Sequence, residues 1–145
     1  MEKKIKKVAV LGSGIMGTGI AAHLAGCGIP VRLLDIVPFD LPDEDKKKPA
    51  KRNKLAADAL KTALKTKKPT PVFYQKDMAN LIEIGNFDDD MDKIADCDWI
   101  IEVVVERLDI KQQVMEKIAA NRKKGSIVST NTSGIPLKDI SAKMD

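Results

Sequence analysis

A glycine-rich turn near the N-terminus has the spacing of a phosphate-binding loop. Residues 12–17 read Gly-Ser-Gly-Ile-Met-Gly and lie between a short apolar stretch and a run of helix-forming residues. In that setting Gly12 permits a tight turn, Gly14 lets the backbone approach a pyrophosphate, and Gly17 lets the helix pack closely on the strand. The N–H groups at the start of the helix then face the phosphates. The spacing predicts a dinucleotide site.

An aspartate supplies the second half of this prediction. Asp35 ends the next apolar stretch, 18 residues after Gly17. A carboxylate in that position can accept hydrogen bonds from the ribose hydroxyls of adenosine, and it repels the 2′-phosphate of NADP. We therefore expect NAD as the cofactor. FAD, which binds to the same kind of turn, and a glycine turn followed by an aspartate with no ligand role are the alternatives.

The elements that position these residues alternate between strand and helix. Apolar runs at residues 7–11 and 30–35 predict two strands, and the helix between them, from 15 to about 27, has apolar spacing at Met16, Ile20 and Leu24. Further strands are expected at 81–84, 98–105 and 126–129, with helices over 55–64 and 110–118 and from near Pro136. Since such crossovers join parallel strands, the fold class is α/β. We expect a Rossmann-type, doubly wound, mostly parallel sheet in a single domain, residues 1–145.

Composition restricts the class of protein further. A chain with 43% hydrophobic and 32% charged residues is typical of soluble proteins, and no apolar stretch approaches the roughly 18 residues of a membrane span. The N-terminal residues lack the apolar segment of a signal peptide, so we expect a cytoplasmic protein without membrane association. Cys27 and Cys97 lack the spacing of a zinc or redox site, which predicts two buried free thiols and no metal.

The positive charge is concentrated in one segment. Residues 46–68 hold ten Lys or Arg and one acid, Asp58, a net +9 in a chain whose total is +4. A nucleic-acid role is disfavoured, because aromatic residues are only 3% of the chain and offer no stacking platform. The charge therefore needs a local explanation, and a solvated helix face is one.

Four segments carry a resemblance to a known family. They are residues 12–22, reading Gly-Ser-Gly-Ile-Met-Gly-Thr-Gly-Ile-Ala-Ala, together with 81–90, 98–111 and the Ser-Thr-Asn-Thr-Ser of 129–133. In these segments the chain resembles the NAD-binding domain of 3-hydroxyacyl-CoA dehydrogenases over nearly its whole length. It is most similar to the longer bacterial and archaeal forms, in which such a domain can precede an enoyl-CoA hydratase domain.

The resemblance implies roles for particular residues. Glu106 and Lys111 match an acid and a lysine that contact the nicotinamide end of NAD, and Asn131 matches a residue near the nicotinamide ring. Ser133 matches the serine that hydrogen-bonds the 3-oxygen of the substrate and is the one catalytic candidate. Arg107 stands where the family usually has Asn, which affects only local hydrogen bonding. The expected cofactor contacts are Gly12, Ser13, Gly14, Ile15, Met16, Gly17, Asp35, Val104, Glu106, Lys111 and Asn131.

Local structure offers other readings of the same residues. Ser133 could cap the last helix, and Glu106 or Lys111 could be a solvated surface charge. The spacing of the motif does not distinguish these readings from a role in the site.

The implied reaction is oxidation of (3S)-3-hydroxyacyl-CoA to 3-oxoacyl-CoA by NAD in fatty-acid β-oxidation. With such a substrate, lysines of the basic segment such as Lys65, Lys67 and Lys68 could meet the phosphates of coenzyme A, and a solvated helix face is the alternative. The family's base is a histidine in a Gly-x-His-Phe-Phe-Asn-Pro segment, and the sequence reaches Asp145 before such a segment. His23, within the first helix, is not expected to replace it. The resemblance also implies a helical C-terminal domain as partner, so the 145 residues alone should be inactive.

Two functions compete with this one. The first is another NAD-dependent β-hydroxyacid dehydrogenase, acting on small carboxylates. The second is a non-catalytic NAD-binding sensor module.

Overall fold

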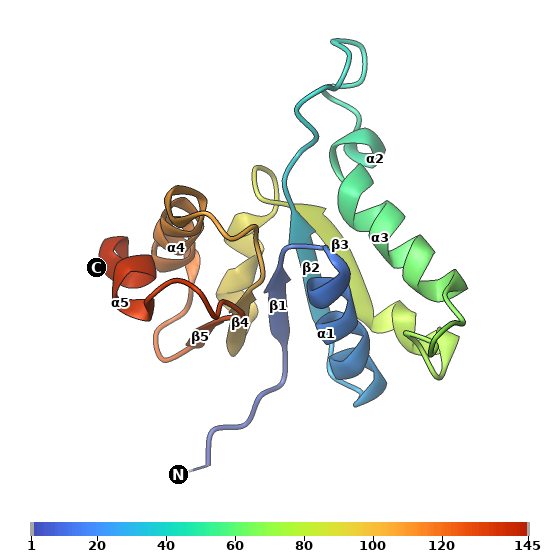
Figure 1. Cartoon of the computed structure of the whole chain (residues 1–145), viewed down its shortest axis with the longest axis horizontal. Helices are drawn as coiled ribbons and strands as arrows, with labels where there is room; N and C mark the ends of the chain where they lie inside the picture. The colour runs from blue at the N-terminus through green and yellow to red at the C-terminus, as the bar shows by residue number, and fades with distance from the viewer. Residues whose placement is uncertain (1, 145) are drawn as a thin grey trace.

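The computed structural model describes residues 2–144, which form a five-stranded sheet with helices on both faces (Figure 1). The strands are β1 (Val8–Leu11), β2 (Val31–Asp35), β3 (Ile82–Asn86), β4 (Trp99–Glu102) and β5 (Ile127–Thr130). Their order is β3-β2-β1-β4-β5, and all neighbouring strands are parallel. The predicted doubly wound α/β fold is confirmed.

The two faces of the sheet bury separate hydrophobic clusters. Along β1, Val8 and Val10 join one cluster and Ala9 and Leu11 join the other, as expected because successive side chains point to opposite faces. The first face is covered by α1 (Ile15–Gly26) and α3 (Lys54–Lys65), and η1 (Lys76–Leu81) lies beside it. The second is covered by η2 (Met91–Asp96), α4 (Leu108–Asn121), α5 (Leu137–Ile140) and η3 (Ser141–Lys143).

Helix α1 contacts the sheet through its smallest residues. Gly17, Ala21 and Ala25 are buried, whereas Met16 is 59% exposed and Ile20 is half-buried. A Cβ atom on Gly17 would lie 1.9 Å from the carbonyl oxygen of Gly12, so no larger side chain fits at this position. Of the large apolar residues at the predicted helical spacing, Leu24 is buried in the core and Ile20 packs against it, whereas Met16 is exposed.

Strand β4 is shorter than the sequence predicts. The apolar run over 98–105 predicts a strand of the same length, but β4 ends at Glu102 and the next three residues leave the sheet. The Val103 N–H still donates to the Leu11 carbonyl at 2.8 Å before the chain turns away. Val103–Val105 line a cavity rather than extend the sheet. A run of apolar residues looks the same in the sequence whether it forms a buried strand or lines a cavity.

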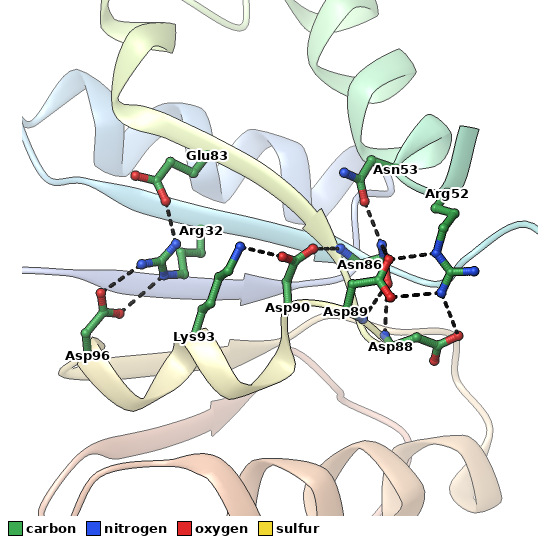
Figure 2. A network of polar contacts seen from close by, with 10 residues as sticks. All are labelled: Arg32, Arg52, Asn53, Glu83, Asn86, Asp88, Asp89, Asp90, Lys93 and Asp96. Atoms are coloured by element: carbon green, nitrogen blue, oxygen red, sulfur yellow. Dashed lines mark hydrogen bonds and ion pairs between the residues drawn. The ribbon is translucent and has the colours of Figure 1, made fainter. Parts of the chain in front are cut away.

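A polar network attaches the basic segment to the end of β3 (Figure 2). Asn86 is 1% exposed and donates to the Asn53 side chain at 2.7 Å. Arg52, at the end of α2 (Pro49–Arg52), forms two hydrogen bonds to Asp89, at 2.7 and 2.9 Å. The predicted basic helix is confirmed as α3, and its start is held at the carboxyl edge of the sheet. From there α3 runs about 18 Å toward the opposite edge.

The two cysteines lie in different environments. Cys97 is buried as predicted, and burial raises the pKa of its thiol to about 12. Cys27 is exposed, so the expectation that both thiols are buried is wrong for this residue. It lies in the turn after α1, between Gly26 and Gly28, where the chain leaves the core.

None of the helices within residues 2–144 combines the length and apolar character that crossing a membrane requires.

Candidate functional site

A large cavity lies at the carboxyl edge of the sheet, where the strand order reverses. Strand β1 pairs with β2 on one side and β4 on the other, and open α/β sheets bind ligands at such a point. The cavity has a volume of about 1150 Å³. It is lined by residues 12–17, 35–39, 87–88 and 103–107, together with Ile110, Gln113, Val114, Lys117 and Asn131.

The glycine turn forms one side of this cavity. Gly12 has φ +117°, a conformation that favours glycine, and a Cβ atom there would lie 2.4 Å from the Val103 carbonyl oxygen. Gly17 is held equally closely against Gly12, as described above. Gly14 differs, because nothing lies within 4 Å of the position its Cβ would take. That open space beside the backbone is what a bound pyrophosphate needs.

The first turn of α1 presents unused hydrogen-bond donors to the cavity. The first helical bond runs from the Thr18 N–H to the Gly14 carbonyl, at 2.9 Å. The N–H groups of residues 15–17 precede it and have no partner within the helix. No acidic residue lies in this turn, so the positive end of the helix dipole is available to an anion. The residues present therefore fit a dinucleotide phosphate.

Asp35 connects the glycine turn to the end of β2. Its Oδ2 accepts hydrogen bonds from the backbone N–H of Ser13, at 2.8 Å, and from the Ser13 hydroxyl. Its Oδ1 accepts the N–H of Ile36 at 2.7 Å. A carboxylate has about four acceptor positions, so about one remains, on Oδ1, for a ribose hydroxyl. Asp35 thus has the position that the NAD prediction requires.

The opposite side of the cavity is held by a buried ion pair. Lys111 and Glu102 both have fully buried side chains, and the Lys111 Nζ lies 2.9 Å from the Glu102 Oε1. Lys111 therefore does not line the cavity, and a solvated surface charge is the wrong description of it. Tertiary packing places it beneath the loop 103–107, where it supports residues that do face the cavity.

Glu106, which the resemblance places at the nicotinamide end of NAD, is exposed and lines the cavity. Its carboxylate accepts a hydrogen bond from the Thr132 hydroxyl at 2.5 Å and lies 3.2 Å from the Lys111 Nζ. These two contacts, the Thr132 bond first, lower the pKa of Glu106 below its ordinary value. Glu106 is thus an ionised acid at neutral pH, connecting the loop after β4 to the loop after β5.

The loop after β5 contributes Asn131 to the cavity and places Ser133 just outside it. The Asn131 N–H donates to the Glu102 carbonyl at 2.9 Å, which holds this loop beside β4. Ser133 is exposed and is not among the lining residues. The residue preceding α5 is Pro136, so capping of that helix does not explain Ser133.

The structure adds site residues that the sequence did not single out. Glu102 is the most informative, because an acid within an apolar strand is a recognisable signal that a buried partner must exist. Phe39 is the second, with a side chain that is 92% exposed at the cavity wall formed by residues 35–39. An aromatic ring so exposed at a cavity is a candidate contact for a planar base.

Two other groups lie away from the cavity. His23 is exposed on α1 and lines a separate, apolar groove of about 330 Å³ beside Trp99. Lys65 ends α3 and is followed by Lys67 and Lys68, near the amino edge of the sheet. These three lysines therefore lie toward the edge of the sheet opposite the cavity, whereas the lysines near α2 lie on the edge of the cavity.

Comparison with known proteins agrees with this geometry. Residues 7–145 match the family described as 3-hydroxyacyl-CoA dehydrogenase, NAD binding domain. A Bacillus subtilis protein named as a probable 3-hydroxyacyl-CoA dehydrogenase is 50% identical over 146 residues, covering 97% of this chain and 18% of that protein. The fatty acid oxidation complex subunit alpha of Vibrio parahaemolyticus is 31% identical, and the match covers 97% of this chain and 18% of that protein.

A solved structure shows the same fold. The 3-hydroxybutyryl-CoA dehydrogenase of Escherichia coli superposes with a TM-score of 0.72 at 24% identity, covering 99% of this chain and 28% of that one. The chain thus spans less than a third of each of these relatives. The family match, the sheet order and the glycine-lined cavity agree: this chain belongs to the 3-hydroxyacyl-CoA dehydrogenase family, as an NAD-binding domain.

Proposed function

We propose that the protein containing this domain oxidises (3S)-3-hydroxyacyl-CoA to 3-oxoacyl-CoA, and that the domain binds the NAD that accepts the hydride. The observation that carries the proposal is the cavity at the strand-order reversal, with the glycine turn and Asp35 on one side and Glu106 and Asn131 on the other. Relatives named for 3-hydroxyacyl-CoA dehydrogenation and fatty acid oxidation support the substrate class.

The cofactor would extend across the cavity. Its pyrophosphate would meet the N–H groups at the start of α1, beside Ser13, Gly14, Ile15, Met16 and Gly17, and its adenosine ribose would meet Asp35. The nicotinamide would then lie on the β4 side, near Val104, Glu106 and Asn131. When bound, NAD supplies the hydride acceptor, while the protein supplies orientation and the proton acceptor.

Substrate oxidation needs a proton acceptor beside the 3-hydroxyl. Bound NAD would take up the hydride from C3, and the hydroxyl proton would pass to a base, so that electrons and protons both balance. Ser133, next to the Thr132–Glu106 contact, would hydrogen-bond the 3-oxygen. We assign the base, and the helical domain that closes over the substrate, to further parts of a longer protein like the relatives. His23 lies in a different groove and is not assigned this role.

The basic segment would contact coenzyme A through its first part. Lys46, Lys48 and Lys54 are paired with nearby aspartates, whereas Lys47 and Lys51 have no carboxylate within salt-bridge distance among residues 2–144. The Arg52–Asp89 contact holds this part at the cavity edge.

In the longer protein, Lys47→Gln with Lys51→Gln should raise the KM for acetoacetyl-CoA, most strongly at low salt. The control replaces Lys65, Lys67 and Lys68 with glutamine, and it should leave the KM for acetoacetyl-CoA unchanged.

Cofactor binding by the 145-residue chain tests the first half of the proposal. Calorimetry should show binding of NAD, weaker binding of NADP, and no turnover of acetoacetyl-CoA with NADH. A substrate panel on the longer protein tests the second half. Activity on small hydroxycarboxylates but not on acyl-CoA would favour another β-hydroxyacid dehydrogenase, and absence of any turnover would favour a sensor.

A further inference from the structure

We infer that Glu102 is a positioning residue for the nicotinamide side of the cavity and that it acts through Lys111. The inference rests on the proposed placement of NAD. If the pyrophosphate lies at the start of α1 and the ribose at Asp35, the rest of the dinucleotide must cross β1 toward β4, because the strands lie in the order β2-β1-β4. The loop 103–106 is then the wall that the nicotinamide meets.

The ammonium of Lys111 is surrounded by oxygen atoms of the protein. It donates hydrogen bonds to Glu102 Oε1 at 2.9 Å and to the Val104 carbonyl at 3.1 Å, and it forms an ion pair with Glu106 Oε1 at 3.2 Å. Of these three residues only Glu106 is exposed. Lys111 therefore holds the loop that lines the cavity.

Glu102 holds the same loop from the other direction. Its Oε1 accepts the Val104 N–H at 2.7 Å as well as the Lys111 ammonium, so the ion pair binds both polar backbone groups of Val104. Its Oε2 accepts a hydrogen bond from the Thr130 hydroxyl at the end of β5. A single carboxylate thus connects β4, β5, α4 and the loop that lines the cavity.

The burial of Glu102 and Lys111 means that neither charge can be removed alone without disturbing the other. Both side chains are 0% exposed, and a charge without a partner in such a place is strongly unfavourable. A neutral residue in place of Glu102 would release Lys111 from its fixed position, and the carbonyl of Val104 and the carboxylate of Glu106 would shift with it. Within residues 2–144 the glycine turn and Asp35 form no hydrogen bond to the pair, so the adenosine side should keep its shape.

The test compares two ligands that share the adenosine half. Calorimetry on the 145-residue chain would measure NADH, which has the nicotinamide, and ADP-ribose, which lacks it. We expect Glu102→Gln to weaken NADH at least tenfold and ADP-ribose less than twofold, and to remove the change in nicotinamide fluorescence seen on binding to the unsubstituted chain. Glu116→Gln, an exposed carboxylate on α4, is the matched control and should change neither ligand.

A paired variant separates positioning from stability. Glu102→Gln combined with Lys111→Met removes both buried charges, and its melting temperature should recover most of any loss caused by Glu102→Gln alone. We expect its NADH affinity to stay low. Equal weakening of NADH and ADP-ribose, no weakening of either, or normal NADH binding by the paired variant would each overturn the inference. If the unsubstituted chain binds neither ligand, the proposed function fails instead.

Discussion

The two sides of the cavity are built by different physical means. On the β1–α1–β2 side the shape comes from backbone: Gly12 and Gly17 allow contacts that no larger residue could make, and Asp35 is bonded to the turn itself. On the β4–α4 side the shape comes from a fully buried ion pair, Glu102 with Lys111. The first side depends on the absence of side-chain atoms, and the second depends on charges that remain buried together.

The largest difference between the two sides should appear when the ion pair is broken. Lys111→Ala leaves Glu102 as a buried charge without its ammonium partner, which should lower the free energy of unfolding by about 3–5 kcal/mol. Urea unfolding measures this change. Lys117→Ala, an exposed lysine on the same helix, should stay within about 0.5 kcal/mol of the unsubstituted chain. A loss at Lys111 as small as that at Lys117 would contradict the importance of the pair.

The glycine side should be sensitive to a single methyl group. Gly17→Ala places a Cβ atom 1.9 Å from the Gly12 carbonyl oxygen, so α1 must move away from the turn. We expect a loss of about 1–3 kcal/mol in stability, together with loss of NAD binding. Thermal unfolding and calorimetry measure the two effects.

Gly14→Ala is the matched comparison on the same turn. Its Cβ would meet nothing within 4 Å, so the melting temperature should not change. The methyl group would instead occupy the space proposed for the pyrophosphate, and NAD binding should weaken. Equal melting temperatures for the Gly14 and Gly17 variants, or normal NAD binding by both, would refute this description of the turn.

Replacing Asp35 should affect a different set of ligands from replacing Glu102. Asp35→Ala removes the proposed acceptor for the ribose hydroxyls, so NAD affinity should fall by roughly 1–3 kcal/mol. The loss should be the same for ADP-ribose, unlike the selective loss expected for Glu102→Gln, and the preference for NAD over NADP should shrink. Calorimetry with the three ligands tests this, and a loss confined to NAD would place Asp35 elsewhere in the site.

Lowering the pH should destabilise the fold at Asp98, which lies far from both sides of the cavity. The Lys123 side chain, and then the backbone N–H groups of Lys6 and Lys7, lower the pKa of Asp98 to about 2, against an ordinary value of about 3.9. Because the folded pKa is the lower one, the stabilisation is present above about pH 4 and is lost as the pH falls toward about 2.

Asp98→Asn tests this contribution directly. The variant should unfold more easily at pH 7 by on the order of 1 kcal/mol. The difference should shrink as the pH falls through about 2, where Asp98 in the unsubstituted chain becomes protonated, and it should vanish below that pH. NAD affinity at pH 7 should be unchanged, because Asp98 lies at the amino edge of the sheet, away from the cavity. A stability difference that does not shrink over this pH range would show that the carboxylate charge is not its cause.

The sequence by itself determined the fold class, the glycine turn and the position of Asp35. These features are local: a tight turn, a strand end and a helix start require particular residues at short spacing, whatever surrounds them. The alternation of strands and helices is local too, and it predicted all five strands to within a few residues, apart from the far end of β4.

Tertiary structure alone decided which charges and apolar groups face the cavity. The sequence does not show that Lys111 is buried, yet β4 and α4 together remove it from solvent and pair it with Glu102. Val103–Val105 looked like strand and instead line the cavity, while small residues of α1 are buried in place of Met16. A side chain's exposure depends on elements far away in the sequence, and the pattern of its neighbours along the chain does not contain that information.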